Sequence, residues 1–265
     1  MNKAILKYLG ANTIGLFLVI LVNYLAVALP INGKSTQELS EKYSNLFVPA
    51  GFTFSIWGII YLLLIVFVGW QWLQWRKNDV STLKLINKIG PWFLVSCVAN
   101  FSWILAWHHE LMFISVLIML VILTTLIKIF LTLQDERPLS LGDRVAIQLP
   151  FSVYLGWISV ATIANVTTML VSVDWTGMGT SAQNWAIIMV ITATLVGVIA
   201  IFKRQDVAFM AVIIWALYGI YAKQSAISSE ANDSLIVVVK YCMTLCVIYA
   251  ILTIVGRRRR LVDAN

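Results

Sequence analysis

Eight long apolar runs, separated by short polar connections, dominate the sequence. A membrane-spanning helix needs about 20 mostly apolar residues, because each residue rises about 1.5 Å and the hydrocarbon layer is about 30 Å thick. The runs are close to that length, so the pattern predicts an all-α, polytopic transmembrane bundle of about eight helices. The predicted spans are 9–30, 51–74, 89–108, 111–132, 145–171, 184–202, 206–223 and 234–256.

The composition supports the same class. Of the 265 residues, 60% are hydrophobic and only 12% are charged, whereas a soluble domain carries about twice that charged fraction. The net charge of +7 does not indicate a nucleic-acid partner, because the basic residues lie in the short connections and act as topology signals. The partner that the sequence predicts is the lipid bilayer.

The distribution of these basic residues predicts the orientation. If the N-terminus is cytoplasmic, 15 of the 19 Lys and Arg residues face the cytoplasm, including the run 257–260. The four on the outer side are Lys34, Lys42, Lys223 and Lys240. The positive-inside rule then places both termini in the cytoplasm, and we expect a bacterial plasma membrane. Two alternatives stay open: the first run could be a cleaved signal sequence, and the arginine run could bind anionic lipid head groups.

The longest outer connection, residues 31–50, has features of an ordered segment. Ser35 and Glu38 have the spacing of a capping box. An apolar stripe on a short helix is predicted after them, formed by Leu39, Tyr43, Leu46 and Phe47. Such a segment could cover the outer mouth of the bundle as a lid, or lie in the interface and cover nothing.

The turn His108-His109-Glu110 is so short that the third and fourth spans must form an antiparallel hairpin. We expect these turn residues to be solvated. An intramembrane enzyme would need metal ligands or an acid–base set to join them, and the sequence offers none. We therefore expect neither a catalytic site nor a metal site.

Aromatic and amide residues recur at helical spacing on three spans. Residues three, four or seven positions apart share one face of a helix. The stripes are Trp57 and Tyr61; Asn100, Trp103 and Trp107; and Tyr154, Trp157, Ala161 and Asn165. If they converge, they form a pocket with flat apolar walls and a few polar anchors, which suits a large planar ligand. The alternative is ordinary helix packing, with each amide bonded to a neighbouring helix.

The same residues resemble a known family. Residues 154–165, YLGWISVATIAN, resemble the fifth-helix signature of the translocator protein / tryptophan-rich sensory protein family (TspO/MBR). The sequence NFSW at 100–103 resembles its third-helix Asn-x-x-Trp. Residues 49–57 followed by Tyr61 resemble the start of its second helix, although Phe52 stands where the family has Trp.

The resemblance covers about residues 9–175 and implies a TspO-like five-helix unit at 1–175. The additional three-helix segment, 176–265, has no counterpart in these motifs. The resemblance further implies a homodimer and a sensory or translocating role, with a tetrapyrrole such as protoporphyrin, or a sterol-like molecule, as ligand and no cofactor. By matching position, the pocket residues would be Trp57, Tyr61, Asn100, Trp103, Trp157, Ala161 and Asn165.

A second functional class also fits a polytopic bundle. The chain could be a transporter of small hydrophobic or amphipathic molecules, for which the last three helices supply a second half. Residues 9–130 and 145–256 show no internal repeat that would indicate an inverted-repeat carrier.

Overall fold

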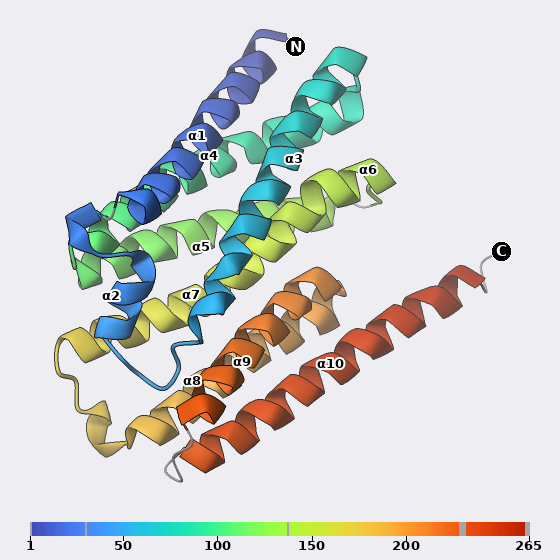
Figure 1. The fold of residues 1–265 in the computed structure, drawn as a ribbon. Coiled ribbons are helices and arrows are strands. Elements are labelled where there is room, and N and C mark those ends of the chain that lie inside the picture. The colour runs from blue at the N-terminus through green and yellow to red at the C-terminus, as the bar shows by residue number, and fades with distance from the viewer. Residues whose placement is uncertain (1, 30, 137, 228–231, 263–265) are drawn as a thin grey trace. The chain divides into compact units, whose positions relative to one another are not determined.

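The computed structural model describes the chain except residues 1, 30, 137, 228–231 and 263–265. Within the described part all regular structure is helical, and eight helices are long and apolar enough to cross a membrane (Figure 1). The long helices are α1 (Asn2–Ala28), α3 (Ile56–Lys77), α4 (Val80–His108), α5 (Met112–Asp135), α7 (Leu149–Ser172), α8 (Ala182–Arg204), α9 (Val207–Ile227) and α10 (Asp233–Val262). All eight predicted spans are confirmed. Three basic sites of the predicted topology lie outside the described residues: Arg137, the side chain of Lys3 and the side chains at 257–260.

The third span begins earlier than predicted, at Val80 instead of residue 89. Asp79 caps the helix, because its carboxylate accepts hydrogen bonds from the backbone N–H groups of Ser81 and Thr82. These bonds favour the charged form and hold the pKa of Asp79 below its usual range. The added turns carry Lys84 and Lys88, so hydropathy alone assigned them to a loop.

By the proximity of their Cα atoms, the residues fall into two units. The first unit comprises 1–39 and 55–158, and the second comprises 40–54 and 159–265. The chain therefore changes unit three times: within the outer connection, before residue 55 and within α7. The motifs suggest another kind of division, a family module that ends at residue 175. That boundary stays a prediction.

In the first unit, α1 packs along α4, and three phenylalanines join α3, α4 and α7. Gly15 allows the close approach of α1, since a Cβ there would lie 3.2 Å from the side chain of Leu94. The rings of Phe67, Phe93 and Phe151 are fully buried, with centroids 4.9–5.8 Å apart in edge-to-face geometry. This packing is the apolar core of the unit.

A buried carboxylate links three segments at the cytoplasmic end that the charge pattern predicts. Asp143 lies in the short helix α6 (Leu141–Asp143), and its Oδ1 accepts hydrogen bonds from Trp70 Nε1 at 2.9 Å and Thr82 Oγ1 at 3.0 Å. Ser140 Oγ donates to its Oδ2 at 2.7 Å. The predicted fifth span began at 145 and left Asp143 in a loop, whereas the membrane-capable segment starts at Leu141. Four hydroxyl or indole bonds satisfy this carboxylate without a cation.

A π-helical turn, η3 (Arg144–Gln148), precedes α7. The N–H of Leu149 donates to the carbonyl of Arg144, five residues earlier. Pro150 follows, and it explains the wider turn: proline has no N–H to donate, and its ring crowds the carbonyl four residues before it.

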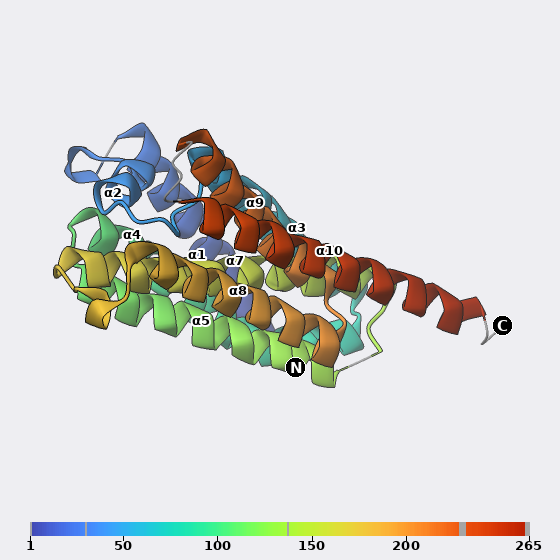
Figure 2. The ribbon, with the colours of Figure 1, turned by 90° about the horizontal axis from the view of Figure 1, so that it is seen from below.

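In the second unit, α8, α9 and α10 lie side by side (Figures 1 and 2). Residues 40–54 pack on α9. The N–H of Ala50 donates to the carbonyl of Gly219 at 3.0 Å, and Trp215 Nε1 donates to the carbonyl of Thr53 at 3.0 Å. Gln224 Nε2 donates to the carbonyl of Leu46 at 2.8 Å. The second half of the outer connection is therefore fixed to a helix.

The predicted capping box of the outer connection is confirmed. The N–H of Glu38 donates to Ser35 Oγ at 3.2 Å, and the N–H of Ser35 donates to Glu38 Oε2 at 2.6 Å, which lowers the pKa of Glu38. The predicted helical stripe is wrong beyond its first member. Helix α2 (Thr36–Lys42) ends before Tyr43, and Asn45 Oδ1 instead accepts from the N–H groups that follow it, forming a turn.

Gly219 lies in close contact with residues 40–54, and it yields a stability prediction. A Cβ at Gly219 would lie 2.0 Å from Thr53 Oγ1 and 3.0 Å from Pro49. We expect Gly219→Ala to lower the free energy of unfolding by about 1–3 kcal/mol, because the loop must move away. Thermal unfolding in detergent, followed by maleimide labelling of the buried free thiols Cys97 and Cys246, measures this.

The matched control is Gly58→Ala, since a Cβ there meets no atom of the described residues within 4 Å. We expect this variant to be neutral or slightly more stable, because alanine favours a helix over glycine by about 1 kcal/mol. Equal midpoints for Gly219→Ala and the wild type would contradict the close packing of the loop on α9.

Candidate functional site

The candidate site begins at the first turns of α3. Trp57 and Tyr61 are one turn apart, and their rings stack at a centroid distance of 5.6 Å and an angle of 22°. Both side chains are half-buried. The helical spacing predicted this shared face, and the stacked rings present one flat aromatic surface.

Helix α7 brings two further rings to this surface. Trp57 meets Tyr154 at 6.1 Å and Trp157 at 6.3 Å, in both cases edge to face. Tyr154 and Trp157 are buried. The aromatic stripes of the second and fifth spans therefore lie together within the first unit.

A chain of hydrogen bonds extends this cluster to α4 and α1. Asn100 Nδ2 donates to the hydroxyl of Tyr154 at 3.0 Å, and Asn23 Nδ2 donates to Asn100 Oδ1 at 2.9 Å. Asn100 is 1% exposed, so these partners replace water. Asn23 is part of the site that the sequence did not single out. Its position inside a long apolar run, where an amide needs a partner, was the available signal.

The second half of the α4 stripe reaches the outer connection. Trp103 and Trp107 are buried and stack on each other at 5.4 Å and 26°. Trp107 Nε1 donates to the carbonyl of Thr36 at 3.3 Å. This pair forms a second aromatic surface, farther along α4 than Asn100.

Ala161 and Asn165 lie one and two turns beyond Trp157 on α7. They belong to the second unit, whereas the ring cluster belongs to the first. Asn165 is buried and Ala161 is half-buried. The site described here is therefore built from seven of the nine predicted residues.

The chemistry of the cluster is neutral. The hydroxyl of Tyr61 is buried and has no hydrogen-bond partner among the described residues. The rings of Trp57, Tyr154 and Trp157 and the amide of Asn100 complete the group, and none of these side chains carries a charge. Within the described chain, no group of three His, Cys, Asp or Glu side chains could hold a metal ion. Flat apolar walls with hydroxyl and amide anchors favour binding by stacking and neutral hydrogen bonds.

The expected solvation of the turn after α4 is wrong for His108. Its ring is fully buried, Nδ1–H donates to the carbonyl of Ile104 at 2.8 Å, and Nε2 lies 3.5 Å from Thr36 Oγ1. The carbonyl of His108 also accepts from Asn32 Nδ2 at 3.0 Å. The first half of the outer connection folds over this helix end, which local spacing could not show. His109 is exposed, as expected.

The fold defines an integral membrane protein whose helices enclose a cluster of aromatic rings and amides. A family model described as TSPO-like protein matches residues 8–255, and the chain belongs to that family. The match confirms the resemblance that the motifs suggested, and it extends through the three last spans, for which those motifs had no counterpart. No curated protein and no solved structure matches the chain significantly.

The bond between Asn100 and Tyr154 yields a prediction about coupling. Removing either partner leaves the other without its bond in an apolar surrounding. We expect the double-mutant cycle of Asn100→Ala and Tyr154→Phe to give a coupling of roughly 0.5–2 kcal/mol. Reversible denaturant unfolding in mixed micelles measures the four stabilities.

The control cycle pairs Asn100→Ala with Tyr241→Phe, since Tyr241 is 73% exposed on α10. These two changes should add within about 0.5 kcal/mol, because Asn100 and Tyr241 share no hydrogen-bond partner among the described residues. A coupling near zero for Asn100 and Tyr154 would show that their hydrogen bond does not hold α4 and α7 together.

Proposed function

We propose that this TSPO-like protein binds a flat, largely apolar molecule at the cluster of Trp57, Tyr61, Asn100, Tyr154 and Trp157. The ligand class that fits is a tetrapyrrole such as protoporphyrin, or a sterol-like molecule. The observation that supports this proposal most directly is the buried hydroxyl of Tyr61, which has no hydrogen-bond partner among the described residues and sits on a ring that stacks on Trp57. A buried hydroxyl without a partner destabilises the free protein by about 1–3 kcal/mol, and a ligand acceptor would remove that penalty.

The arrangement also limits how such a ligand is held. Stacked and edge-to-face ring pairs contribute about 0.5–1.5 kcal/mol each beyond burial, so the macrocycle face supplies most of the affinity. None of the five side chains is cationic, so the carboxylates of a porphyrin would stay outside the cluster, toward the interface. Trp103 and Trp107 belong to the same proposed site through their place on α4. Ala161 and Asn165 lie in the second unit and stay predictions of the family resemblance.

The test is a porphyrin titration of the purified protein, read by the shift of the porphyrin absorbance band. We expect Tyr61→Phe to weaken binding about tenfold, because it removes the hydroxyl and keeps the ring, and 1.4 kcal/mol corresponds to a factor of ten. The same variant should be as stable as the wild type or more stable, since the lost hydroxyl had no partner.

Tyr241→Phe, on the exposed face of α10, is the control and should leave the affinity unchanged. Porphyrin that binds Tyr61→Phe and the wild type equally would contradict the role of this hydroxyl. No absorbance shift at saturating porphyrin would contradict the ligand class.

We propose a sensory or translocating role for this binding, without catalysis. The cluster offers no nucleophile beside a base and no acid–base pair, which an enzyme of this architecture would need. A transporter of small amphipathic molecules is the competing function. Flux of porphyrin into proteoliposomes that contain the protein would favour it over a purely sensory role.

We further propose a bacterial plasma membrane, cytoplasmic termini and a homodimer. The charge asymmetry of the connections supports the orientation, and the family resemblance supports the dimer. A fluorescent protein that matures only in the cytoplasm, fused after residue 265, should be bright. A dark fusion, with a bright signal from an exported reporter at the same position, would reverse the topology.

A further inference from the structure

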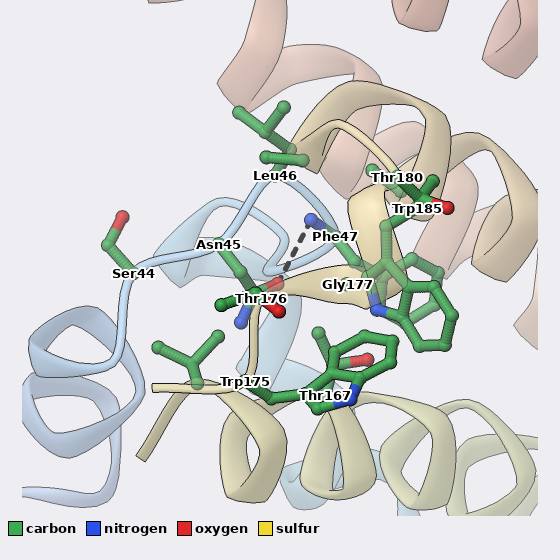
Figure 3. A pocket seen from close by; sticks show the side chains of 13 residues that line it. Ser44, Asn45, Leu46, Phe47, Thr167, Trp175, Thr176, Gly177, Thr180 and Trp185 are labelled. Atoms are coloured by element: carbon green, nitrogen blue, oxygen red, sulfur yellow. Dashed lines mark hydrogen bonds between the residues drawn. The ribbon is translucent and has the colours of Figure 1, made fainter. Parts of the chain in front are cut away.

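The second unit contains a cavity of about 440 Å³ that the proposed function does not use. Three segments line it: the turn at 44–47, the end of α7 with the connection that follows, and the start of α8 (Figure 3). The volume lies in the range of small-molecule sites, about 300–1,000 Å³. All of its lining residues belong to one unit.

Two tryptophans form an aromatic wall of this cavity. The rings of Trp175 and Trp185 lie edge to face, with centroids 4.8 Å apart and an angle of 67°, and Figure 3 shows them on the same side of the cavity. Phe47, which is 1% exposed, adds a third ring from the opposite segment. Their places near the ends of two spans are typical of an interfacial belt, but their mutual packing gives a surface for a flat ligand.

The walls are held in place before any ligand arrives. Gly177, Met178 and Gly179 all have positive φ, at 71°, 53° and 83°, and the N–H of Thr180 closes this turn onto the carbonyl of Gly177. On the facing segment, Asn45 Oδ1 accepts from the N–H of Phe47, drawn as a dashed line in Figure 3. A fixed wall reduces the entropy lost on binding.

The polar groups of the cavity define the chemistry of its ligand. The indole N–H groups of Trp175 and Trp185 make no hydrogen bond within the described part of the chain, and Ser44 and Thr176 are exposed residues. None of the 13 lining residues is charged. A charged ligand would lose its hydration without gaining an ion pair in the cavity. A carbonyl oxygen could instead accept hydrogen bonds from the indole N–H groups.

We propose that this cavity binds a neutral, flat aromatic molecule that carries a carbonyl acceptor. The aromatic wall stacks against the ring system, and the indole N–H groups of Trp175 and Trp185 donate to the carbonyl. The site is separate from the cluster around Trp57, and its ligand is smaller than a tetrapyrrole and uncharged.

The experiment compares three probes of one shape: 2-acetylnaphthalene, naphthalene and 2-naphthoate. Calorimetric titration into the protein in lipid nanodiscs, with empty nanodiscs subtracted, gives the affinities. We expect 2-acetylnaphthalene to bind about tenfold more tightly than naphthalene, because only it accepts hydrogen bonds. The charged 2-naphthoate should bind most weakly.

Two variants locate the binding. Trp175→Phe with Trp185→Phe keeps an aromatic ring at each position and removes both donors, so 2-acetylnaphthalene should bind no more tightly than naphthalene does to the same variant. Trp92→Phe, at a 39% exposed tryptophan of α4, is the control and should change nothing. Ala182→Trp fills the cavity from an exposed position at the start of α8, and it should abolish binding while the unfolding midpoint stays unchanged.

Equal affinities for 2-acetylnaphthalene and naphthalene, or binding that survives Ala182→Trp, would overturn the proposal and indicate partition into lipid. These measurements test the cavity separately from the proposed porphyrin binding. Ala182→Trp should leave porphyrin binding intact, and Tyr61→Phe should leave 2-acetylnaphthalene binding intact.

Discussion

Within a membrane, a buried amide or hydroxyl has no water to replace a lost partner, and this constraint organises the first unit. The bonds from Asn23 to Asn100 and from Asn100 to Tyr154 fix the rotation of three helices about their axes. Elsewhere in the first unit, the carboxylate of Asp143 accepts hydrogen bonds from Trp70 on α3 and Thr82 on α4 and so links these helices to α6. The apolar packing of the phenylalanine core is non-directional. The polar contacts are directional, so they allow only one register of the helices relative to one another.

The sequence predicts the eight spans well, because length and hydropathy are local properties. It also predicts which side chains share a helix face, but the meeting of Trp57 with Trp157 required two such faces to converge, which helical spacing left open. Partners that come from distant segments could not be predicted. Asn23 and Thr36 reach α4 from about 75 residues away along the chain, and no local pattern identifies them. The start of α4 was missed for another reason. Its lysines lower the local hydropathy, although the helix already begins after the capping residue Asp79.

The ring cluster and the cavity at Trp175 share one chemical property: both lack charged side chains. In each, specificity must come from shape and from a few donors or acceptors, because ion pairing is absent from their described residues. The two differ in how these polar groups are placed. Tyr61 carries a buried hydroxyl at the end of a ring that stacks on Trp57, whereas the N–H groups of the cavity are part of the indole rings of Trp175 and Trp185.

The π-helical turn at Arg144–Gln148 has a consequence for the direction in which α7 presents its side chains. In an α-helix each residue turns the chain by about 100°, whereas a π turn takes about one residue more per turn. The wider turn therefore accommodates an extra residue while Tyr154 still faces Asn100; in an uninterrupted α-helix that residue would rotate Tyr154 by about 100°. The direction in which the aromatic face of α7 points is thus set by residues that precede that face in the sequence.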